Sequence, residues 1–316
     1  MEFKKFNSLE NTYRGAFIDR IKQEGLSDGL WIVTSKLHGA NFSFWCDGDA
    51  VKVGSRSQFV DGTFYGSQQV INKHEEEFLR YHREHFKKGQ IVVIYGELFG
   101  NGIQKGVKYG EKRFNAFDVV VDGEILLKQN AYDLATVAGF EWVPVLFCGS
   151  FEECMNVSCE YKSLYTPEDH VGDNWEEGIV IEPNKPQFLS NEKRVYLKKK
   201  HPSFSEKKNS PKNPSPKIEF NTEQQEAFDE VCSYINKNRI DAAISKFGCI
   251  TTKDFGKISG MVIKDIIEEY EKYAVEDNNG NPLKVLFGEI WATFNREITK
   301  VVGAELRPVF VELLEE

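Results

Sequence analysis

The sequence predicts an α+β fold in which an antiparallel-sheet domain is followed by a small all-α domain. Between residues 30 and 200 the apolar residues form short runs separated by turn residues, which is typical of β-structure. The dipeptides Asp47-Gly48 and Asp122-Gly123 separate paired runs, and this favours antiparallel hairpins over parallel βαβ units. Towards the C-terminus apolar residues recur at helical intervals instead, which predicts helices there.

Eight runs are the candidate strands of the first domain. In chain order they are LWIVTSK, NFSFW, AVKVGS, QIVVIYGELF, FNAFDVVV, EILLKQ, GIVIEP and RVYLKK. Helical spacing appears from Gln68 to Phe86, where the apolar residues could share one face. On this helix we interpret His74, His82 and His85 as solvated side chains rather than metal ligands.

The change of pattern also defines the domains. We predict the sheet domain over residues 1–207, a linker over 208–217 and the helical domain over 218–316. The linker region is rich in Pro, Ser, Asn and Lys, which cannot bury enough apolar surface to become ordered.

Four helices are expected in the second domain. The first begins at Thr222, because Thr222 and Gln225 have the spacing of a capping box. The second ends near Gly248, a residue type that commonly caps helix C-termini. Apolar residues from 262 to 267 and from 286 to 298 predict the other two.

Composition favours a folded protein without a membrane segment. The chain is 41% hydrophobic and 13% aromatic, unlike disordered sequences. It contains no apolar run long enough to span a membrane, and the start, MEFKKFNSLEN, lacks the apolar region of a signal peptide, so we expect a cytoplasmic location. The six cysteines form no CxxC pair, which argues against a zinc ribbon or a disulfide framework.

The distribution of charge leaves room for a nucleic-acid partner. A net charge of −9 alone argues against such a partner, because Lys and Arg supply most affinity for phosphate backbones. Between Lys193 and Lys217, however, nine basic residues accompany a single acid, Glu206. Positive charge is therefore concentrated at the end of the sheet domain.

Lys36 is the first candidate for chemistry. It ends an apolar run in SKLHGANF, and Gly39 follows for a tight turn. A lysine placed in this way would project into a cleft, where cationic neighbours and partial desolvation favour an uncharged, nucleophilic amine. Taken alone, a solvent-facing lysine is the more common explanation.

Other candidates follow in order along the chain. They are Arg56 in VGSRS, Glu97 in YGELFG, Phe117 in FNAFDVVV, Glu177 before GIVIEP, and Lys198 and Lys200 in YLKKK. Each has an ordinary alternative: strand-end carboxylates, a core aromatic ring, or lysines that protect an edge strand. Alternation along a strand places Lys198 and Lys200 on one face and Leu197 on the other.

Together, these residues resemble the ordered motifs of the covalent nucleotidyltransferases, the superfamily of polynucleotide ligases and capping enzymes. KLHGANF is similar to the RNA ligase form of the lysine motif. FKKFNSLEN, GELFGNGIQK, KKKHPSFSEKK and ISKFGCITTKDFGKISGMVIKDIIEE resemble the phage RNA ligase 2 family. The resemblance covers nearly the whole chain and implies an antiparallel-sheet nucleotidyltransferase domain, similar to an ATP-grasp ligase, before the helical domain.

The resemblance implies an ATP-dependent RNA ligase that joins 3′-OH and 5′-phosphate RNA ends, with nicks in duplex RNA as the expected substrate. Lys36 would take AMP from ATP, AMP would move to the 5′-phosphate, and the 3′-OH would attack and release AMP. The expected cofactors are ATP and Mg²⁺, with Mn²⁺ also possible. A monomer is expected, with no membrane partner, working in the host bacterial cytoplasm if it is phage-encoded.

Each site residue then has an expected role. Nucleotide binding is assigned to Lys36, His38, Glu97, Phe117, Lys198 and Lys200. Within this set, Lys198 and Lys200 suit the α-phosphate, Glu97 the ribose hydroxyls, Phe117 the adenine ring and His38 the triphosphate.

The remaining roles concern the RNA end and the metal ion. Arg56 and Asn41 are assigned to the RNA end, since the guanidinium of Arg56 offers a planar fork to a phosphate. Glu177 offers a hard oxygen ligand to Mg²⁺.

Two stretches depart from expectation. Many relatives carry a lysine at the end of a Glu-Gly-x-x-x-Lys pattern, where this sequence has Glu182. A carboxylate cannot contact phosphate as that lysine would. GNGIQKG imitates a phosphate-binding loop but lacks the G-x-x-x-x-G-K-[ST] spacing.

Two alternatives stay open at this point. A DNA ligase or a capping guanylyltransferase usually carries a β-rich OB domain after the last lysine motif, whereas residues 218–316 have a helical pattern. A non-catalytic RNA-binding relative would keep the basic segment while Lys36 stays unmodified.

Overall fold

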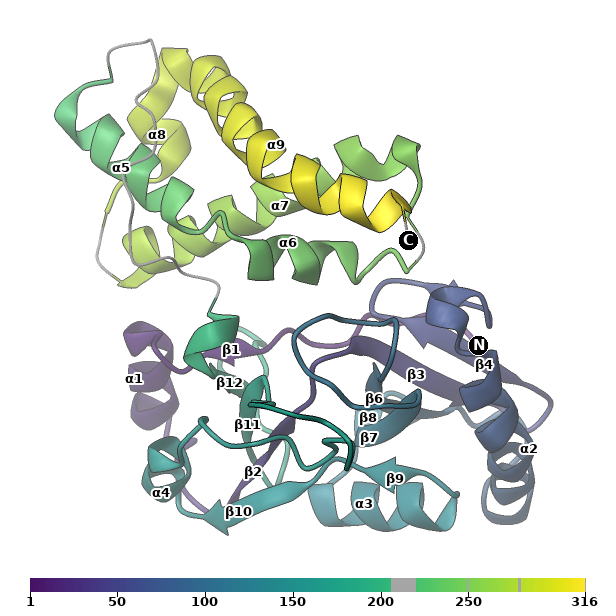
Figure 1. Ribbon diagram of the computed structural model, residues 1–316. Coiled ribbons are helices and arrows are strands. Elements are labelled where there is room, and N and C mark those ends of the chain that lie inside the picture. Colours follow the sequence, from purple (N-terminus) through teal and green to yellow (C-terminus); the bar gives the residue numbers. More distant parts are fainter. Residues whose placement is uncertain (206–219, 249, 278–279, 316) are drawn as a thin grey trace. The chain divides into compact units, whose positions relative to one another are not determined.

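The computed structural model describes residues 1–205, 220–248, 250–277 and 280–315 (Figure 1). The chain divides into two compact units, Met1–Phe204 and Ser205–Glu316, which are described separately below. The predicted linker, residues 208–217, lies outside the described residues. No helix in the described ranges has the length and apolar character that a membrane span requires.

The described residues of the first unit contain two mostly antiparallel sheets. The first sheet has the order β1-β12-β11-β2-β10, with bounds β1 Glu10–Asn11, β2 Trp31–Lys36, β10 Val145–Gly149, β11 Gly178–Pro183 and β12 Leu197–Lys200. The second has the order β5-β4-β3-β6-β7-β8 with β9 beside β7, and its bounds are β3 Ala40–Cys46, β4 Val51–Ser55, β5 Phe59–Val60, β6 Val92–Phe99, β7 Arg113–Val121, β8 Glu124–Ile125 and β9 Glu141–Trp142. The α+β class and the antiparallel arrangement are therefore confirmed.

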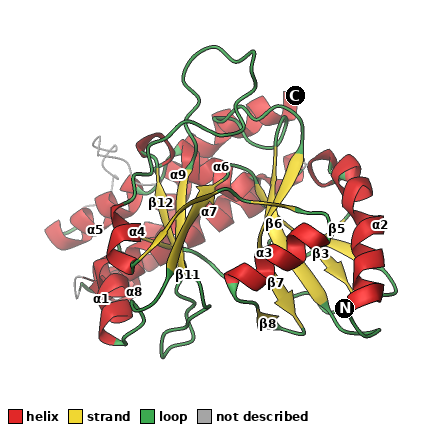
Figure 2. Cartoon of the chain, turned by 90° about the horizontal axis from the view of Figure 1, so that it is seen from below, coloured by secondary structure: helices red, strands yellow, loops and turns green. Residues whose placement is uncertain are grey.

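Helices lie beside each sheet (Figure 2). They are α1 Gly15–Gln23, α2 Gln68–His85, α3 Lys128–Val137 and α4 Phe151–Asn156. Phe17 of α1 and Phe151 of α4 share a buried cluster with Trp31 and other residues of the first sheet. Phe78 of α2 and Ala131 of α3 share another with the second sheet. Each sheet therefore buries one apolar face beneath its own helices.

A third cluster lies where the two sheets face each other. It contains Trp45 and Tyr95 of the second sheet, Val180 and Tyr196 of the first sheet region, and Phe6. This cluster fixes one sheet against the other. Polar residues that continue along the same two inner faces therefore meet at the junction between the sheets.

The hairpin predictions are confirmed, and two strand predictions need correction. β3 pairs with β4, and β7 pairs with β8. The run EILLKQ forms a strand only over Glu124–Ile125, because α3 begins at Lys128. The run RVYLKK forms a strand only from Leu197. The start of the run pairs with another segment, because Arg194 forms a β-bridge with Phe188 and the Val195 N–H donates to the Gln187 carbonyl oxygen at 2.9 Å. α1, α4 and β10 were not predicted.

The histidine prediction on α2 is wrong for two of three residues. His74 and His82 are buried, whereas His85 is exposed. His74 stacks on Phe140 with a ring separation of 4.6 Å, and His82 Nε2 donates to the carbonyl oxygen of Gln90 at 2.8 Å. Burial lowers the pKa of His74 to about 4, so its neutral ring packs as an aromatic side chain.

The described residues of the second unit are helical. The helices are α5 Thr222–Ser233, α6 Lys237–Ile244, α7 Phe255–Tyr270, α8 Leu283–Phe287 and α9 Trp291–Glu315, and a π-helical segment, Glu271–Asp277, continues α7. They pack around one apolar cluster that includes Phe228, Ile240, Val262 and Phe294. The predicted helical domain is thus confirmed.

Two details of this unit correct the helix predictions. The capping box uses Asn221 and Gln224, one residue earlier than predicted, since Asn221 Oδ1 accepts from the Gln224 N–H at 2.8 Å. The apolar stretch from 286 to 298 is shared by α8 and α9, which are separated at Gly288 with φ +39°.

Candidate active site

The turn Leu37–Gly39 joins the two sheets and places Lys36 at their junction. β2 ends at Lys36 in the first sheet, and β3 begins at Ala40 in the second. Gly39 is required here because a Cβ atom would lie 2.2 Å from the carbonyl oxygen of Leu98, closer than side chains tolerate. The backbone of β6 thus packs directly against the turn.

Lys36, Gly178 and Lys200 lie side by side on β2, β11 and β12, because Gly178 pairs with both lysines. A Cβ atom at Gly178 would lie 2.2 Å from the carbonyl oxygen of Lys199. The position between the two lysines therefore carries no side chain, because the backbone of β12 packs directly against it.

The predicted alternation along β12 is confirmed. Leu197 belongs to the buried cluster of the first sheet, and Lys199 Nζ donates to the carbonyl oxygens of Met155 and Val157 at 3.2 and 2.9 Å. Lys198 and Lys200 lie on the opposite face. β12 runs between β1 and β11, so these lysines do not protect an edge strand.

Two ammonium groups and an imidazole ring surround Glu177. Its Oε2 atom lies 2.7 Å from Lys36 Nζ and 3.4 Å from His38 Nδ1, and its Oε1 atom lies 2.9 Å from Lys200 Nζ. Burial alone would raise the pKa of Glu177, but Lys200, Lys36 and His38 outweigh it and hold that pKa well below its usual range. Glu177 is therefore a carboxylate that binds the nucleophile candidate directly.

The ring of His38 is fixed on two sides. Nε2 lies 3.0 Å from the carbonyl oxygen of Lys105 and must donate to it. Nδ1 faces Glu177 and donates to that carboxylate only when the ring carries both protons. The face of the ring meets Phe204 at a centroid distance of 4.8 Å.

The second sheet contributes a row of polar residues that face the first. Asn41, Glu97 and Asn115 are cross-strand partners on β3, β6 and β7, so their side chains share one face. The Oδ1 atoms of Asn41 and Asn115 are buried and accept no hydrogen bond within the described structure. Two unsatisfied acceptors beside a carboxyl group suit a ligand that offers hydroxyl or amino donors.

Asn115 is a site residue that the sequence analysis missed. Its Nδ2 atom donates to the Tyr165 hydroxyl at 2.6 Å and to the Trp142 carbonyl oxygen at 3.1 Å. These bonds fix the amide orientation and leave Oδ1 as the available acceptor. The alternation of Asn115 with Phe117 in FNAFD could have indicated that both face the site.

Phe117 and Arg56 lie beside the same row. Phe117 is the residue of β7 that a register shift leaves without a pairing partner on β6, and its ring lies 5.2 Å from that of Phe6. Arg56 follows β4, and its Nη2 atom donates to Ser8 Oγ at 2.8 Å. The guanidinium is close enough to Glu97 to favour the ionised form of that carboxyl group. All nine predicted site residues are thus on the two inner faces or at their junction.

Glu97 has an unusual protonation equilibrium. Burial raises its pKa to about 8, with Glu177 adding to the effect and Lys36 and Arg56 opposing it. The ordinary value is about 4.3. At neutral pH the Glu97 carboxyl group therefore keeps its proton, and it can both donate a hydrogen bond to a ligand and accept one.

This equilibrium predicts a pH-dependent stability. Between about pH 4.3 and pH 8 the folded protein holds a proton that the unfolded chain has lost, so stability falls as the pH rises. The Glu97→Gln variant has no charge to bury. Its melting temperature should therefore gain on that of the wild type as the pH rises from 5 to 8, by at least about 2 °C in a chain of this size.

Scanning calorimetry at four pH values would measure this difference. The matched control is Glu124→Gln, at an exposed position on β8. A difference between Glu97→Gln and wild type that is the same at every pH would contradict the raised pKa.

Glu182 stands where many relatives carry a lysine that contacts phosphate, but here its side chain contacts other buried protein groups. It is buried with Asp118, Lys128 and Arg194, and Lys128 Nζ lies 3.1 Å from Asp118 and 2.8 Å from Glu182. Arg194 contacts Asp118 and lies 3.2 Å from Glu182. This buried ion quartet links β7 of the second sheet to β11 of the first.

The described residues contain no group of three or more His, Cys, Asp or Glu side chains that could hold a metal ion. A single carboxylate such as that of Glu177 is compatible with Mg²⁺, because this ion keeps several waters and is commonly held by one or two carboxylates together with substrate phosphates. The described cysteines Cys46, Cys148, Cys154, Cys159 and Cys232 are free thiols.

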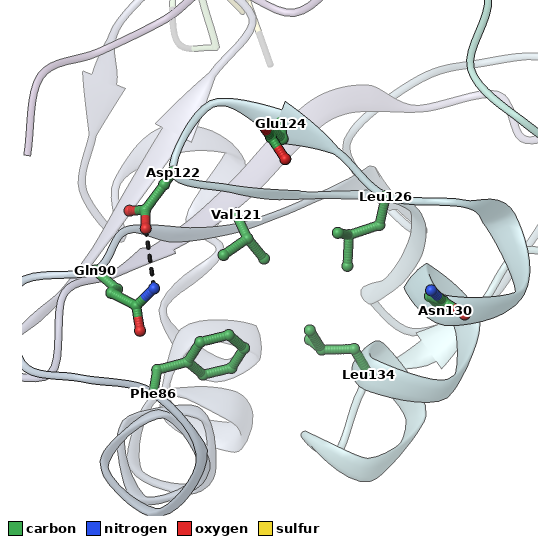
Figure 3. Close-up of a pocket in the computed structure, with 8 residues that line it drawn as sticks. All are labelled: Phe86, Gln90, Val121, Asp122, Glu124, Leu126, Asn130 and Leu134. Carbon is green, nitrogen blue, oxygen red and sulfur yellow. Dashed lines mark hydrogen bonds between the residues drawn. The ribbon is translucent and has the colours of Figure 1, made fainter.

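A separate pocket of about 600 Å³ lies near the end of α2 (Figure 3). Its lining comprises Phe86, Gln90, Val121, Asp122, Glu124, Leu126, Asn130 and Leu134. Figure 3 shows apolar side chains from the helices and the β7–β8 hairpin facing one another, with the Gln90–Asp122 hydrogen bond at one side. No predicted site residue lies in it.

Comparison with known proteins gives a separate family-model match in each of the two units. A family model described as RNA ligase matches residues 29–200, and a model described as T4 RNA ligase 2 C-terminal matches residues 218–308. The Early 65 kDa protein of Autographa californica nuclear polyhedrosis virus is 29% identical over 178 residues, which is 52% of this chain and 30% of that protein.

Solved structures of the Naegleria gruberi RNA ligase are also similar. One, of a point mutant with ATP and Mn, has a TM-score of 0.48 and 17% identity, over 64% of this chain and 57% of that chain. Another, of a different point mutant in the apo form, has a TM-score of 0.47 and 17% identity, over 62% of this chain and 56% of that one. The chain therefore spans less than two thirds of the length of each of these relatives.

Proposed function

The chain belongs to the RNA ligase family, whose model matches more than half of its length, and from this premise we propose that it is an ATP-dependent RNA ligase. The proposal is that it joins 3′-OH and 5′-phosphate RNA ends through a lysyl-AMP intermediate. The observation that carries it is the cluster of Lys36, Glu177 and Lys200 at the junction of the sheets, with contacts of 2.7 and 2.9 Å.

In the first step the Lys36 ammonium gives up a proton, and the resulting amine attacks the α-phosphorus of ATP. A P–N bond forms, the bond to the bridging oxygen of the β-phosphate breaks, pyrophosphate leaves, and the amine releases a proton to solvent. Negative charge builds on the α-phosphate during this step. Lys200 and Lys198, on the same face of β12, are placed to stabilise that charge in the transition state.

The second sheet would hold the nucleoside. The carboxyl group of Glu97 and the amide oxygen of Asn115 can accept hydrogen bonds from ribose hydroxyls, which would satisfy the buried Asn115 Oδ1 atom that has no partner among the described residues. The ring of Phe117 lies two residues beyond Asn115 on β7 and can stack on adenine.

Glu177 would hold a divalent metal ion, Mg²⁺ or Mn²⁺. When bound, such an ion neutralises charge on the triphosphate. The Glu177 carboxylate is ionised and lies beside the nucleophile. A metal ion would have to replace the ammonium of Lys36 or Lys200 at one of its oxygens. His38, whose Nδ1 atom faces Glu177, would help to orient the triphosphate.

The later steps require RNA. AMP moves from Lys36 to the 5′-phosphate, and the 3′-OH of the other end attacks that activated phosphate and expels AMP. Arg56 and Asn41 are assigned to the RNA end. We propose nicked duplex RNA as the substrate and an RNA-engaging role for the helical unit, which the match of residues 218–308 to a T4 RNA ligase 2 C-terminal model supports.

Labelling with α-³²P-ATP and a divalent metal ion tests the first step directly. The wild type is expected to retain label on a denaturing gel, and mass spectrometry should locate the AMP on Lys36. The Lys36→Ala variant should retain none, because the acceptor amine is absent. A wild type that stays unlabelled with both Mg²⁺ and Mn²⁺ would reject the enzyme and favour a non-catalytic RNA-binding protein.

The same assay separates the related enzymes. Label from α-³²P-GTP but not from ATP would indicate a capping type of nucleotidyltransferase. Sealing of DNA nicks in preference to RNA nicks by the labelled protein would indicate a DNA ligase.

A further inference from the structure

The connection between β6 and β7, residues 100–112, contains the GNGIQKG stretch that imitates a phosphate-binding loop. In the structure it contacts the turn Leu37–Gly39. The carbonyl oxygen of Lys105 accepts from His38 Nε2 at 3.0 Å, and Gln104 Nε2 donates to the carbonyl oxygen of Gly39 at 3.2 Å. The connection therefore binds protein groups next to Lys36.

Tyr109 makes the third contact with this turn. Its hydroxyl oxygen accepts from the backbone N–H of His38 at 2.7 Å and donates its own proton to Glu176 Oε1. The other carboxylate oxygen of Glu176 accepts from Ser163 Oγ at 2.9 Å. The phenol thus links the backbone of the nucleophile turn to a buried carboxyl group.

The Tyr109–Glu176 pair is shielded from solvent and connects both sheets. Glu176 is 0% exposed and Tyr109 is 5% exposed. Tyr109 belongs to the connection within the second sheet, whereas Glu176 directly precedes Glu177 and β11 of the first. Because water cannot replace a hydrogen bond at a buried site, loss of this link leaves the His38 N–H unsatisfied.

The connection is itself held in place. Asn174 Nδ2 donates to the carbonyl oxygen of Lys108 and Asn174 Oδ1 accepts from its N–H, both at 2.8 Å. Ile103 and Val107 are buried. A rigid support of this kind can fix the turn, because its own position is set by packing on both sides.

We infer that Tyr109 and Glu176 are positioning residues that hold the turn Leu37–Gly39, and with it Lys36, in the geometry needed for attack on ATP. This inference rests on the proposed function. It assigns a role to GNGIQKGVKYG: the stretch orients the nucleophile through Tyr109, and its backbone serves the turn rather than a phosphate. Neither residue contacts the reacting atoms.

The Tyr109→Phe variant tests this inference with two measurements. Hydrogen exchange followed by mass spectrometry should show the His38 amide exchanging at least about tenfold faster, because its acceptor is gone. Single-turnover labelling should show a rate constant at saturating ATP that is about 10–100-fold lower, since small misplacements of a nucleophile have effects of this size. The ATP concentration for half-maximal rate should change less than about threefold, because the nucleotide contacts are intact.

Controls separate positioning from general stability. Tyr132→Phe removes a hydroxyl from an exposed side chain on α3 and should leave both measurements at wild-type values. Glu176→Gln keeps the side-chain volume and should give a smaller loss of rate than Tyr109→Phe. Melting temperatures are recorded for all variants, and if Tyr109→Phe does not fold, Glu176→Gln carries the test.

Each outcome decides the question. Faster exchange together with a lower rate constant supports the inference. Faster exchange with an unchanged rate constant overturns the positioning role, and unchanged exchange overturns the contact itself. If the wild type is never labelled, the proposed ligase function fails, while the exchange measurement still decides whether Tyr109 holds the turn.

Discussion

The Lys200→Ala variant is expected to form lysyl-AMP about 10²–10³-fold more slowly than the wild type, the usual effect of removing one charge-stabilising donor from a transition state. Lys200 lies opposite Gly178, across from Lys36, and its Nζ atom is 2.9 Å from Glu177. The ammonium is therefore within the same group of side chains as the nucleophile. If the proposed function is right, its removal deprives the α-phosphate of a cation, and it also removes one of the contacts that hold Glu177.

The neighbouring lysine provides a matched control. Lys199 is the adjacent residue of β12, but its Nζ atom donates to two carbonyl oxygens near α4 on the far face of the sheet. Lys199→Ala should lower the melting temperature without lowering the rate of lysyl-AMP formation. Rapid-quench labelling at saturating ATP measures that rate. Equal rates for Lys199→Ala and Lys200→Ala would show that lysyl-AMP formation does not depend on which face of β12 carries the lysine.

The sequence was sufficient where a local pattern determines the structure. The strands β2, β3, β4, β6, β7 and β11 were predicted because each combines an apolar run with turn residues at its ends. The run EILLKQ failed because a short apolar run does not distinguish a strand from the start of a helix. Here Lys128 is the first residue of α3, and its ammonium is buried between carboxylates of two strands.

The candidate site was predictable only in part, for a related reason. Lys36, Glu97, Glu177, Lys198 and Lys200 are visible in the sequence as charged residues at the ends of apolar runs or alternating within one, and their order matches a known pattern. Asn115 shows only its alternation with Phe117, and Tyr109 shows no signal, because their importance depends on partners that are distant in sequence. The Tyr109–Glu176 contact spans 67 residues, and only the folded chain brings the two together.

Glu182 illustrates the opposite case. Many relatives carry a lysine at its position, and a carboxylate cannot contact phosphate as that lysine would. The structure shows instead that it belongs to the buried ion quartet of Asp118, Lys128, Glu182 and Arg194. Burial would raise the pKa of Asp118, but Arg194 and Lys128 outweigh it and keep that pKa low. The burial of a carboxylate at position 182 is therefore explained by the cations that pair with it.

The Glu182→Ala variant is therefore expected to lose about 3–5 kcal/mol of folding free energy, the typical cost of removing one partner from a buried ion pair. Glu182 is 2% exposed, and Lys128 and Arg194 are 5% and 4% exposed. Without Glu182, two buried cations share the single carboxylate of Asp118. Urea unfolding at pH 7 measures the loss, with the exposed Glu124→Ala of β8 as the control.

A double variant distinguishes charge from packing as the source of that loss. Lys128→Leu combined with Glu182→Leu removes one cation and one anion, and it leaves Arg194 paired with Asp118. A buried ion pair contributes little net stability when both of its charges are replaced together by apolar side chains. The free energy lost by the double variant should therefore be smaller than the summed losses of the two single leucine variants, by at least about 1 kcal/mol. Additive losses would mean that the four side chains act as independent packing groups. In that case the link between β7 and β11 would depend on side-chain volume, and the alternation of charges within the quartet would have no energetic role.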